Sequence, residues 1–337
     1  MTTNMAHSNV APKPGPMAAL AFTLMMIVTF PISLLGYVIW VGRIMTAGKS
    51  SGVSATAQGP LSARWTEHLL GTRQDEAAAK LLPLLPGIPP LGLALVSWPL
   101  LTAHRLTGFV PKPFRYPYEG EVPEAEEAGA RQTFFDGIVE RELPGIGQLV
   151  ILGAGFDTRA YRLPAGSPVR CFEVDRPKTQ ALKRDLLAKA GVDTSRVVFV
   201  SADFEQDDWL AKLVEAGFDQ SRPALLLWEG VMIYLEREAV EATLRKVAGL
   251  AKGSLLAFDY FTSEALDSQS LYWRYGRWAT KAAGEPLKFG VDSTPPSRER
   301  LAELLGSCGL ALGEQQTLGK ETDGKRAWAG FATARVE

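Results

Sequence analysis

Hydrophobic residues are distributed very unevenly along this chain. Residues 17–42 and residues 81–103 are two long stretches without a charged side chain. From about residue 123 the pattern changes to short apolar runs that alternate with charge-bearing segments. The sequence therefore predicts an apolar N-terminal region, followed by a domain in which strands and helices alternate.

The first stretch is long enough to cross a bilayer, which takes about 20 apolar residues in a helix. We expect a flexible N-terminus over 1–16 and a transmembrane helix over 17–42. Pro31 should kink this helix, and Tyr37 and Trp40 should lie at the membrane interface. A cleaved secretory signal ending near Ala55-Thr56-Ala57 is the alternative, although the apolar core of such a signal is usually shorter.

The second stretch contains five prolines, which helix interiors resist. These are Pro83, Pro86, Pro89, Pro90 and Pro99. We therefore expect residues 43–122 to be a membrane-associated linker, with a re-entrant or interface-lying segment rather than a regular second span. An apolar pad under the following domain is the alternative. Residues 61–70 predict a short amphipathic helix within this linker.

Basic residues between the two stretches predict the orientation in the membrane. Five of them lie there, at Arg43, Lys49, Arg64, Arg73 and Lys80, whereas only Lys13 precedes the first stretch. The positive-inside rule then places residues 43–80 in the cytoplasm. We expect a single-pass protein with its C-terminal domain in the cytoplasm. Two full spans with residues 43–80 outside is the alternative.

The sequence of the C-terminal domain, residues 123–337, predicts an α/β fold. Apolar runs occur at 148–152, 169–174, 196–200, 224–228, 254–260, 310–317 and 327–334, and helical segments at 177–190, 209–216, 237–250 and 297–308. Fully apolar strands that alternate with helices predict a doubly wound, mostly parallel seven-stranded sheet. The last two runs should form a closing antiparallel pair.

Composition and charge argue against several classes of function and site. The formal net charge is −1, so the chain has no global basic footprint for nucleic acid. Residues 1–110 hold only 10 of the 73 charged side chains. Two cysteines cannot build a disulfide framework or a structural zinc site. All three histidines precede residue 123, so the predicted domain contains no imidazole and no His/Cys metal cluster.

Polar residues follow the predicted strands, where ligands of doubly wound sheets bind. Gly153 and Gly155 follow the first strand, and Asp175 follows the second, 20 residues after Gly155. Asp203 and Glu229 follow the next two strands, and Asp259 stands at the end of the fifth.

Two glycines and an acid about 20 residues later are typical of a nucleoside site, in which the acid accepts the ribose hydroxyls. The third glycine of the dinucleotide pattern is replaced by Thr158, and Asp157 adds a negative charge that would repel a pyrophosphate. The pattern therefore favours a nucleoside that carries a sulfonium, S-adenosyl-L-methionine, over NAD or FAD. A tight turn beside a solvated acid is the alternative.

Four segments in order carry a resemblance to a known family. LGAGFDTRAYRL (152–163), CFEVDRP (171–177), SADFEQDDW (201–209) and WEGVMIYL (228–235) resemble the leucine carboxyl methyltransferase family, closest to its bacterial S-adenosylmethionine-dependent branch. Arg131-Gln132-Thr133-Phe134-Phe135-Asp136 is similar to the family's lead-in motif. The resemblance covers roughly residues 125–335 and implies a class I methyltransferase, Rossmann-like fold.

The resemblance also implies roles for individual side chains. Arg131 would hold the methionine carboxylate, Gly153 and Gly155 would pass under the methionine, and Asp175 would take the ribose hydroxyls. Asp203 would meet the adenine amino group with Phe204 against the ring, Glu229 would lie near the methionine ammonium or the reaction centre, and Tyr234 would face the acceptor. Purely structural roles are the alternatives: Arg131 could pair with Glu140, Phe204 could be core, and Tyr234 could fill the sheet face.

The missing histidines favour an acceptor that needs no general base. A carboxylate is already anionic at pH 7, whereas a hydroxyl would need Asp259, Glu229 or Tyr234 as base. Residues 262–292 form a long insert containing Tyr272, Trp273, Arg274 and Tyr275, which we interpret as a lid or acceptor wall. A surface helix is the alternative.

Together these features predict a membrane-anchored S-adenosyl-L-methionine-dependent O-methyltransferase. Its acceptor would be a carboxylate or hydroxyl of an apolar, lipid-like small molecule taken from the bilayer. A non-catalytic S-adenosyl-L-methionine-binding membrane protein and an NAD-dependent reductase are the alternatives. The sequence sets neither the acceptor's identity nor the oligomeric state.

Overall fold

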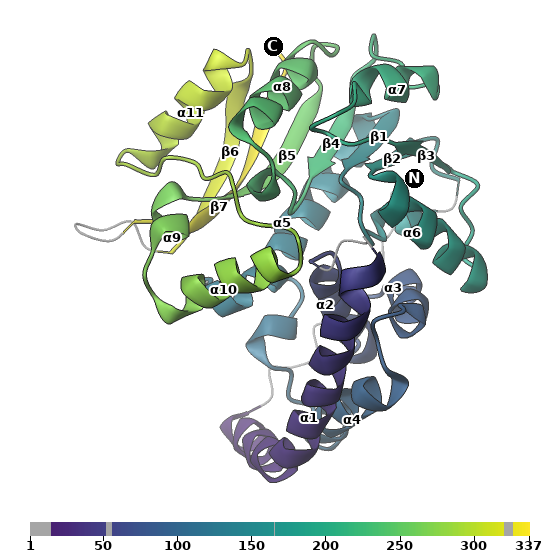
Figure 1. Ribbon diagram of the computed structural model, residues 1–337, viewed down its shortest axis with the longest axis vertical. Helices are drawn as coiled ribbons and strands as arrows, with labels where there is room; N and C mark the ends of the chain where they lie inside the picture. The colour runs from purple at the N-terminus through teal and green to yellow at the C-terminus, as the bar shows by residue number, and fades with distance from the viewer. Residues whose placement is uncertain (1–14, 52–55, 165, 320–325) are drawn as a thin grey trace. The chain divides into compact units, whose positions relative to one another are not determined.

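The chain forms two compact units, Met1–Glu119 and Gly120–Glu337. The computed structural model describes residues 15–51, 56–164, 166–319 and 326–337 (Figure 1). Residues 1–14 of the predicted flexible N-terminus, and Ala55 of the signal-like run, lie outside the described residues.

The first unit is helical. Its α-helices are α1 (Pro16–Ser51), α2 (Gln58–Leu69), α3 (Glu76–Leu81) and α4 (Pro90–Thr107), with short 3-10 helices η1 (Leu82–Leu84) and η2 (Lys112–Phe114). The helix predicted over 61–70 is present as α2, which begins three residues earlier and buries Arg64 and Glu67 as well as Leu61. His68 accepts a hydrogen bond from the backbone N–H of Asp75, and Asp75 caps α3, so His68 has a structural role.

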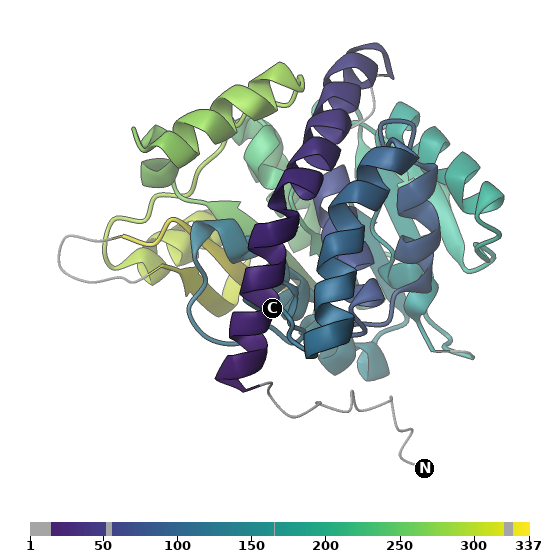
Figure 2. The ribbon, with the colours of Figure 1, turned by 90° about the horizontal axis from the view of Figure 1, so that it is seen from below.

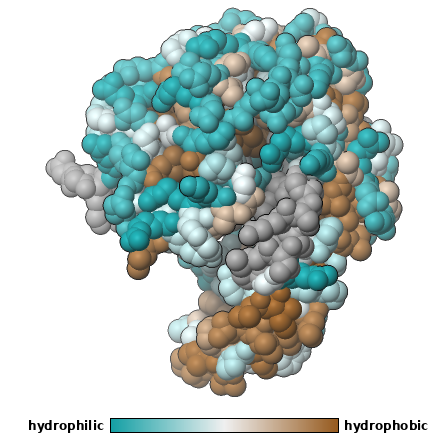
Figure 3. All heavy atoms as spheres, viewed as in Figure 1, coloured by the Kyte–Doolittle hydropathy of each residue, from teal (hydrophilic) through white to brown (hydrophobic). Residues whose placement is uncertain are grey.

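Helix α1 continues through Pro31 and past the predicted end at Gly42. Its segment Pro16–Trp40 is the one helix among the described residues that is long and apolar enough to cross a membrane. Only 6% of its most apolar window is buried, and large side chains such as Val28 are exposed. Figure 3 shows the corresponding brown surface at the lower end of the view. Membrane anchors and secretory signals share this apolar character near the N-terminus.

The second uncharged stretch is only partly irregular. Helix α3 ends at Leu81, the 3-10 helix η1 follows, and α4 then runs for 18 residues with Pro99 inside it. The prolines thus accompany an irregular first half, whereas the second half is a helix; a re-entrant or interface-lying arrangement of this stretch stays a prediction. Three of the five prolines precede α4 and a fourth, Pro90, opens it at a position that needs no backbone donor.

Helices α1 and α4 lie side by side (Figure 2). Two glycines permit their close approach. A Cβ atom on Gly36 would lie 2.9 Å from the carbonyl oxygen of Gly92, and one on Gly92 would lie 3.1 Å from that of Gly36. Small residues that bring backbones together are characteristic of helix pairs in membranes.

The second unit contains the predicted seven-stranded sheet. The strands are β1 (Gln148–Leu152), β2 (Arg170–Asp175), β3 (Val197–Ser201), β4 (Leu225–Trp228), β5 (Leu255–Phe261), β6 (Ala311–Leu318) and β7 (Ala329–Arg335). Their order is β3-β2-β1-β4-β5-β7-β6. Strands β1 to β5 are parallel, and β7 runs antiparallel to both β5 and β6. The predicted mostly parallel α/β sheet with a closing antiparallel pair is confirmed.

Helices cover both faces of this sheet (Figure 1). They are α5 (Glu127–Glu142), α6 (Pro177–Lys189), α7 (Trp209–Glu215), α8 (Arg237–Ala248), α9 (Ser263–Asp267), α10 (Leu271–Ala282) and α11 (Ser297–Ser307), with 3-10 helices η3 (Glu124–Glu126), η4 (Leu143–Gly145), η5 (Arg159–Arg162) and η6 (Met232–Tyr234). The predicted insert over 262–292 thus contains two helices, α9 and α10.

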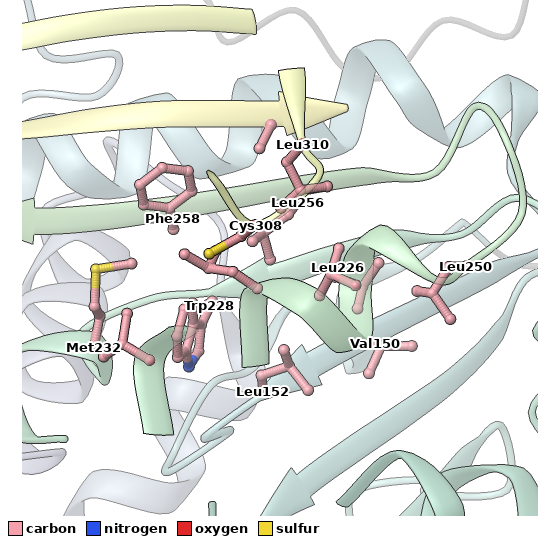
Figure 4. Packing of buried hydrophobic residues seen from close by; sticks show 14 of the residues in the cluster. Val150, Leu152, Leu226, Trp228, Met232, Leu250, Leu256, Phe258, Cys308 and Leu310 are labelled. Carbon is pink, nitrogen blue, oxygen red and sulfur yellow. The ribbon is translucent and has the colours of Figure 1, made fainter. Parts of the chain in front are cut away.

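Alternate residues of each central strand enter two separate cores. Val150 and Leu152 of β1 pack with side chains from α7, α8 and α11, whereas Leu149 and Ile151 pack with α5. Figure 4 shows the first core, in which Trp228 and Cys308 are buried. Because both faces are covered, the strands read as continuous apolar runs, and the polar residues at their carboxyl ends stand out.

Candidate functional site

The turn after β1 depends on its first glycine. Gly153 has a φ of 67°, a conformation that favours glycine, and a Cβ atom there would lie 2.2 Å from Cγ2 of Val231. Gly155 follows with a φ of 45°. The backbone of this turn therefore packs directly against Val231, where a residue with a side chain would collide.

Asp175, at the end of β2, is bound to that turn. Its Oδ2 accepts a hydrogen bond of 2.5 Å from the backbone N–H of Gly155, and its Oδ1 accepts one of 2.6 Å from that of Arg176. Burial raises the pKa of Asp175, and these two hydrogen bonds oppose the rise. A carboxylate has about four acceptor sites, so two remain for the hydroxyls of a ribose.

Arg131 projects from α5 into a group of carboxylates. Its Nη1 lies 3.2 Å from Glu127 and 3.2 Å from Asp259, and its Nε lies 3.3 Å from Glu229. Asp259 also accepts from the backbone N–H of Gly230. Burial alone would lower the pKa of Arg131, but the three carboxylates raise it above its usual range. Within the described part of the chain, Nη2 of Arg131 has no hydrogen-bonding partner, so this nitrogen can serve a ligand carboxylate.

A second arginine connects the β1 turn to the end of β4. Arg159 is almost completely buried, donates to Asp136 at 2.6 Å and to Glu229 at 2.5 Å, and is also bound to Asp157. Arg162 adds a contact to Asp136 at 3.1 Å. Glu229 therefore joins the two arginine groups into one buried network.

Carboxylates outnumber guanidinium groups in this network. Glu127, Asp136, Asp157, Glu229 and Asp259 surround Arg131, Arg159 and Arg162. This excess of negative charge affects the pKa of a carboxyl group in the network. Burial, together with the charges of Asp259 and Glu229, raises the pKa of Glu127 to about 7 despite the opposing charge of Arg131. The site is therefore suited to a ligand that brings positive charge.

The remaining predicted cofactor residues lie at the next strand ends. Asp203 follows β3 and caps the turn there, because its Oδ1 accepts from the backbone N–H of Glu205 at 2.9 Å. Phe204 is half-buried, with its ring centroid 6.1 Å from that of Trp209. Tyr234 ends the 3-10 helix η6 after β4 and is also half-buried.

The four predicted acceptor residues do not share one face of α10. Trp273 is buried, and its ring lies 5.1 Å from that of Phe261 in an edge-on contact. Tyr272, Arg274 and Tyr275 are exposed. The hydroxyl of Tyr272 donates to the carbonyl oxygen of Glu124, in the turn before α5.

A buried ion pair supports β2 from α6. Nζ of Lys183 lies 2.7 Å from Glu173, and both side chains are 1% exposed. The hydroxyl of Tyr161 donates to the same carboxylate at 2.9 Å. Glu173 lies two residues before Asp175, so this pair fixes the strand that carries the predicted ribose ligand.

No group of His, Cys, Asp and Glu side chains suited to a metal ion occurs among the described residues. Cys171 and Cys308 are both buried and reduced.

Comparison with known families finds a match over the N-terminal part of the second unit. Residues 119–248 match the family model described as leucine carboxyl methyltransferase. This segment is therefore similar to the leucine carboxyl methyltransferase family. The family segment carries Glu127, Arg131, Asp175 and Glu229, whereas Asp259 and α10 lie beyond its end.

Individual relatives are similar over part of their length. A "Putative S-adenosyl-L-methionine-dependent methyltransferase" of Mycolicibacterium vanbaalenii is 37% identical over 161 residues, which are 47% of this chain and 50% of that protein. A protein of the same description from Mycolicibacterium paratuberculosis is 36% identical over 187 residues, 53% of this chain and 60% of that protein. The chain thus spans about half the length of the curated relatives it matches.

A solved structure is similar in outline. It is a "putative methyltransferase" from Thermobifida fusca with 18% identity and a TM-score of 0.46, covering 82% of this chain and 94% of that one.

Sequence reasoning gave no site role to several members of the network, among them Glu127 and Arg159. Glu127 lies four residues before Arg131, a spacing at which helical side chains meet, and that spacing was the available signal. Arg159 lies within the motif at 152–163, but nothing in the local pattern separates a buried arginine from a solvated one. Its burial depends on Asp136 and Glu229, which come from distant parts of the chain.

Proposed function

We propose that this chain is an S-adenosyl-L-methionine-dependent O-methyltransferase, held at a membrane, that methylates a carboxylate or hydroxyl of an apolar small molecule. The observation that supports this most strongly is the carboxylate-rich network beside the Gly153 turn. It combines a tight glycine turn, an acid at Asp175 bound to that turn, and an excess of negative charge that a sulfonium and an ammonium would balance.

Each chemical group of the cofactor would have its own binding residues. Asp175 would take the ribose hydroxyls and Nη2 of Arg131 the methionine carboxylate. Glu229 and Asp259 would lie near the ammonium. Asp203 and Phe204 would hold the adenine. The family segment includes all of these except Asp259.

The connection after β1 favours this cofactor over a dinucleotide. Dinucleotide-binding folds place the pyrophosphate at the N-terminus of the helix that follows the first strand. Here the described residues between β1 and β2 contain only the four-residue 3-10 helix η5. Asp157 and Glu229 also bring negative charge to this point, which would repel a pyrophosphate.

Chemistry in such a site is a direct displacement. Bound S-adenosyl-L-methionine supplies a methyl group on a positively charged sulfur: the acceptor oxygen forms the new C–O bond while the C–S bond breaks, and the electron pair stays on sulfur. The protein's task is alignment of the acceptor. A carboxylate acceptor loses no proton. A hydroxyl acceptor would pass its proton to Glu229, Asp259 or Tyr234.

Membrane attachment is part of the proposal. Helix α1 would span the bilayer with the second unit on the cytoplasmic side, where S-adenosyl-L-methionine is made. Helix α4 would accompany it through the Gly36–Gly92 contact without crossing fully. The acceptor would then be an apolar molecule taken from the lipid phase.

Transfer of labelled methyl groups tests the function. The full-length protein in detergent or lipid discs is incubated with methyl-labelled S-adenosyl-L-methionine and a lipid extract. We expect labelled apolar product, released by mild base if it is a methyl ester and stable if it is an ether. Cofactor binding without transfer to any extract would favour a non-catalytic binding protein. Binding of NADH without binding of S-adenosylhomocysteine would favour a reductase.

A further inference from the structure

Helix α10 has one face fixed to the domain. Trp273 packs against Phe261 and Trp328, with ring centroids 5.1 and 6.2 Å away. Its indole Nε1 donates to a carboxylate oxygen of Glu124 at 2.8 Å, and Arg277 donates to the carbonyl oxygen of Leu266. These contacts hold the helix in one rotation about its axis.

The opposite face of α10 is apolar, aromatic and exposed. Leu271, Tyr275 and Trp278 follow each other at helical spacing, which places them on one stripe. They are 81%, 61% and 58% exposed. The rings of Tyr275 and Trp278 lie 5.8 Å apart. Among the described residues of the second unit, no other helix has such a stripe of large exposed apolar side chains.

The charges on α10 are all positive. The helix carries Arg274, Arg277 and Lys281 and has no acidic residue. Arg274 and Lys281 lie seven positions apart on the same edge of the exposed stripe, and both are exposed. A helix with aromatic and leucine side chains on one face, flanked by Lys and Arg, is typical of segments that lie in the interface of an anionic membrane.

We propose that the outer face of α10, formed by Leu271, Arg274, Tyr275, Trp278 and Lys281, binds the surface of an anionic lipid bilayer. The charge of the helix complements anionic headgroups, and α1 gives the same chain a segment suited to a membrane. The proposal concerns binding alone, so it stands or falls separately from methyl transfer.

This surface is connected to the candidate site. Trp273 and Tyr272 both bond to Glu124, which lies in the turn that opens α5. Helix α5 carries Glu127 and Arg131. A bilayer bound at α10 would therefore lie beside the element that forms one wall of the site, and an apolar acceptor would have a short path from lipid to that wall.

An environment-sensitive fluorophore on the full chain tests the proposal. Ala282 lies on the exposed stripe, and Ala242, on α8, is an exposed alanine among charged neighbours. Each is changed to cysteine (A282C, A242C) and labelled with a nitrobenzoxadiazole dye. The native Cys171 and Cys308 are buried and should not react. The protein is placed in discs of phosphatidylcholine, with or without phosphatidylglycerol.

We expect a blue-shifted, stronger emission at A282C in discs with phosphatidylglycerol, and no shift at A242C. The added substitutions R274Q and K281Q should abolish the dependence on phosphatidylglycerol, with the unfolding temperature unchanged. Emission at A282C that is the same in both discs and in detergent would overturn the proposal. A blue shift in detergent that grows with protein concentration would also overturn it, because the face would then bind a second copy of the chain.

Discussion

Nη1 of Arg131, on α5, lies 3.2 Å from Oδ2 of Asp259, in the C-terminal half of β5. The two residues are 128 positions apart in the chain. Glu127 and Glu229 complete the surroundings of the same guanidinium, so one arginine neutralises part of a group of three carboxylates. Arg131 therefore supports the site structurally, and under the proposed function it would also bind the methionine carboxylate.

Replacing Arg131 by methionine should weaken both binding and folding. A buried charge that loses its partner costs about 3–5 kcal/mol, and a lost charged hydrogen bond to ligand costs about 1.5–3 kcal/mol. We expect the affinity for S-adenosylhomocysteine to fall at least tenfold by calorimetry, and urea unfolding to shift to lower concentration. R141M removes an exposed pair with Glu314 and should change stability by less than about 1 kcal/mol. Equal effects of the two variants would contradict this role of Arg131.

Replacing Gly153 by alanine should distort the β1 turn. The new Cβ would collide with Val231 at 2.2 Å, and the φ of 67° would add about 1–2 kcal/mol of backbone strain. We expect G153A to lose stability in urea and to bind S-adenosylhomocysteine more weakly, with partial recovery in G153A/V231A. The control G306A lies in α11 with open space around it, and should gain up to about 1 kcal/mol. A G153A protein as stable as the parent would show that the turn relaxes without cost.

Much of this arrangement follows from sequence. Strand ends such as Leu152 and Trp228 are visible because buried parallel strands are continuous apolar runs bounded by glycine or acid. The acids at these ends were therefore found. Glu127 and Arg159 were not, because their burial depends on partners from other elements.

The helices of residues 90–107 and 271–282 were also hard to foresee. In the first, proline content suggested irregularity, but the prolines gather before the helix and at its start. In the second, the sequence suggested that the aromatic residues at 272–275 line the acceptor together. Helical geometry instead buries Trp273 and leaves Tyr275 exposed.

Glu127 should make the stability of the ligand-free protein depend on pH. Its pKa is raised from 4.5 to about 7, so the folded state binds a proton more tightly than the unfolded state. Stability should therefore fall as pH rises from about 4.5 to 7, by about 3 kcal/mol at most, and this contribution should be flat above 7. In urea unfolding, E127Q should match the parent near pH 5 and be more stable near pH 8. The same difference between the two proteins at both pH values would contradict the raised pKa.

Lys183 should be far more important for folding than an exposed lysine of the same helix. K183M leaves Glu173 buried without its cation, which costs about 3–5 kcal/mol. K189M removes an exposed pair with Asp185, worth about 0.5 kcal/mol or less. Urea unfolding should separate the two variants clearly, and K183M/E173Q should recover part of the loss. A K183M protein that unfolds like K189M would mean that Glu173 is protonated in the parent.

The most direct test of the central claim is calorimetric titration of the full-length protein with S-adenosylhomocysteine, with D175A and the exposed control D185A measured in parallel. We predict binding to the parent and to D185A, and binding at least tenfold weaker to D175A, because the ribose loses hydrogen bonds to a charged acceptor. Binding of NADH without binding of S-adenosylhomocysteine, or a D175A protein that binds as tightly as the parent, would contradict the account.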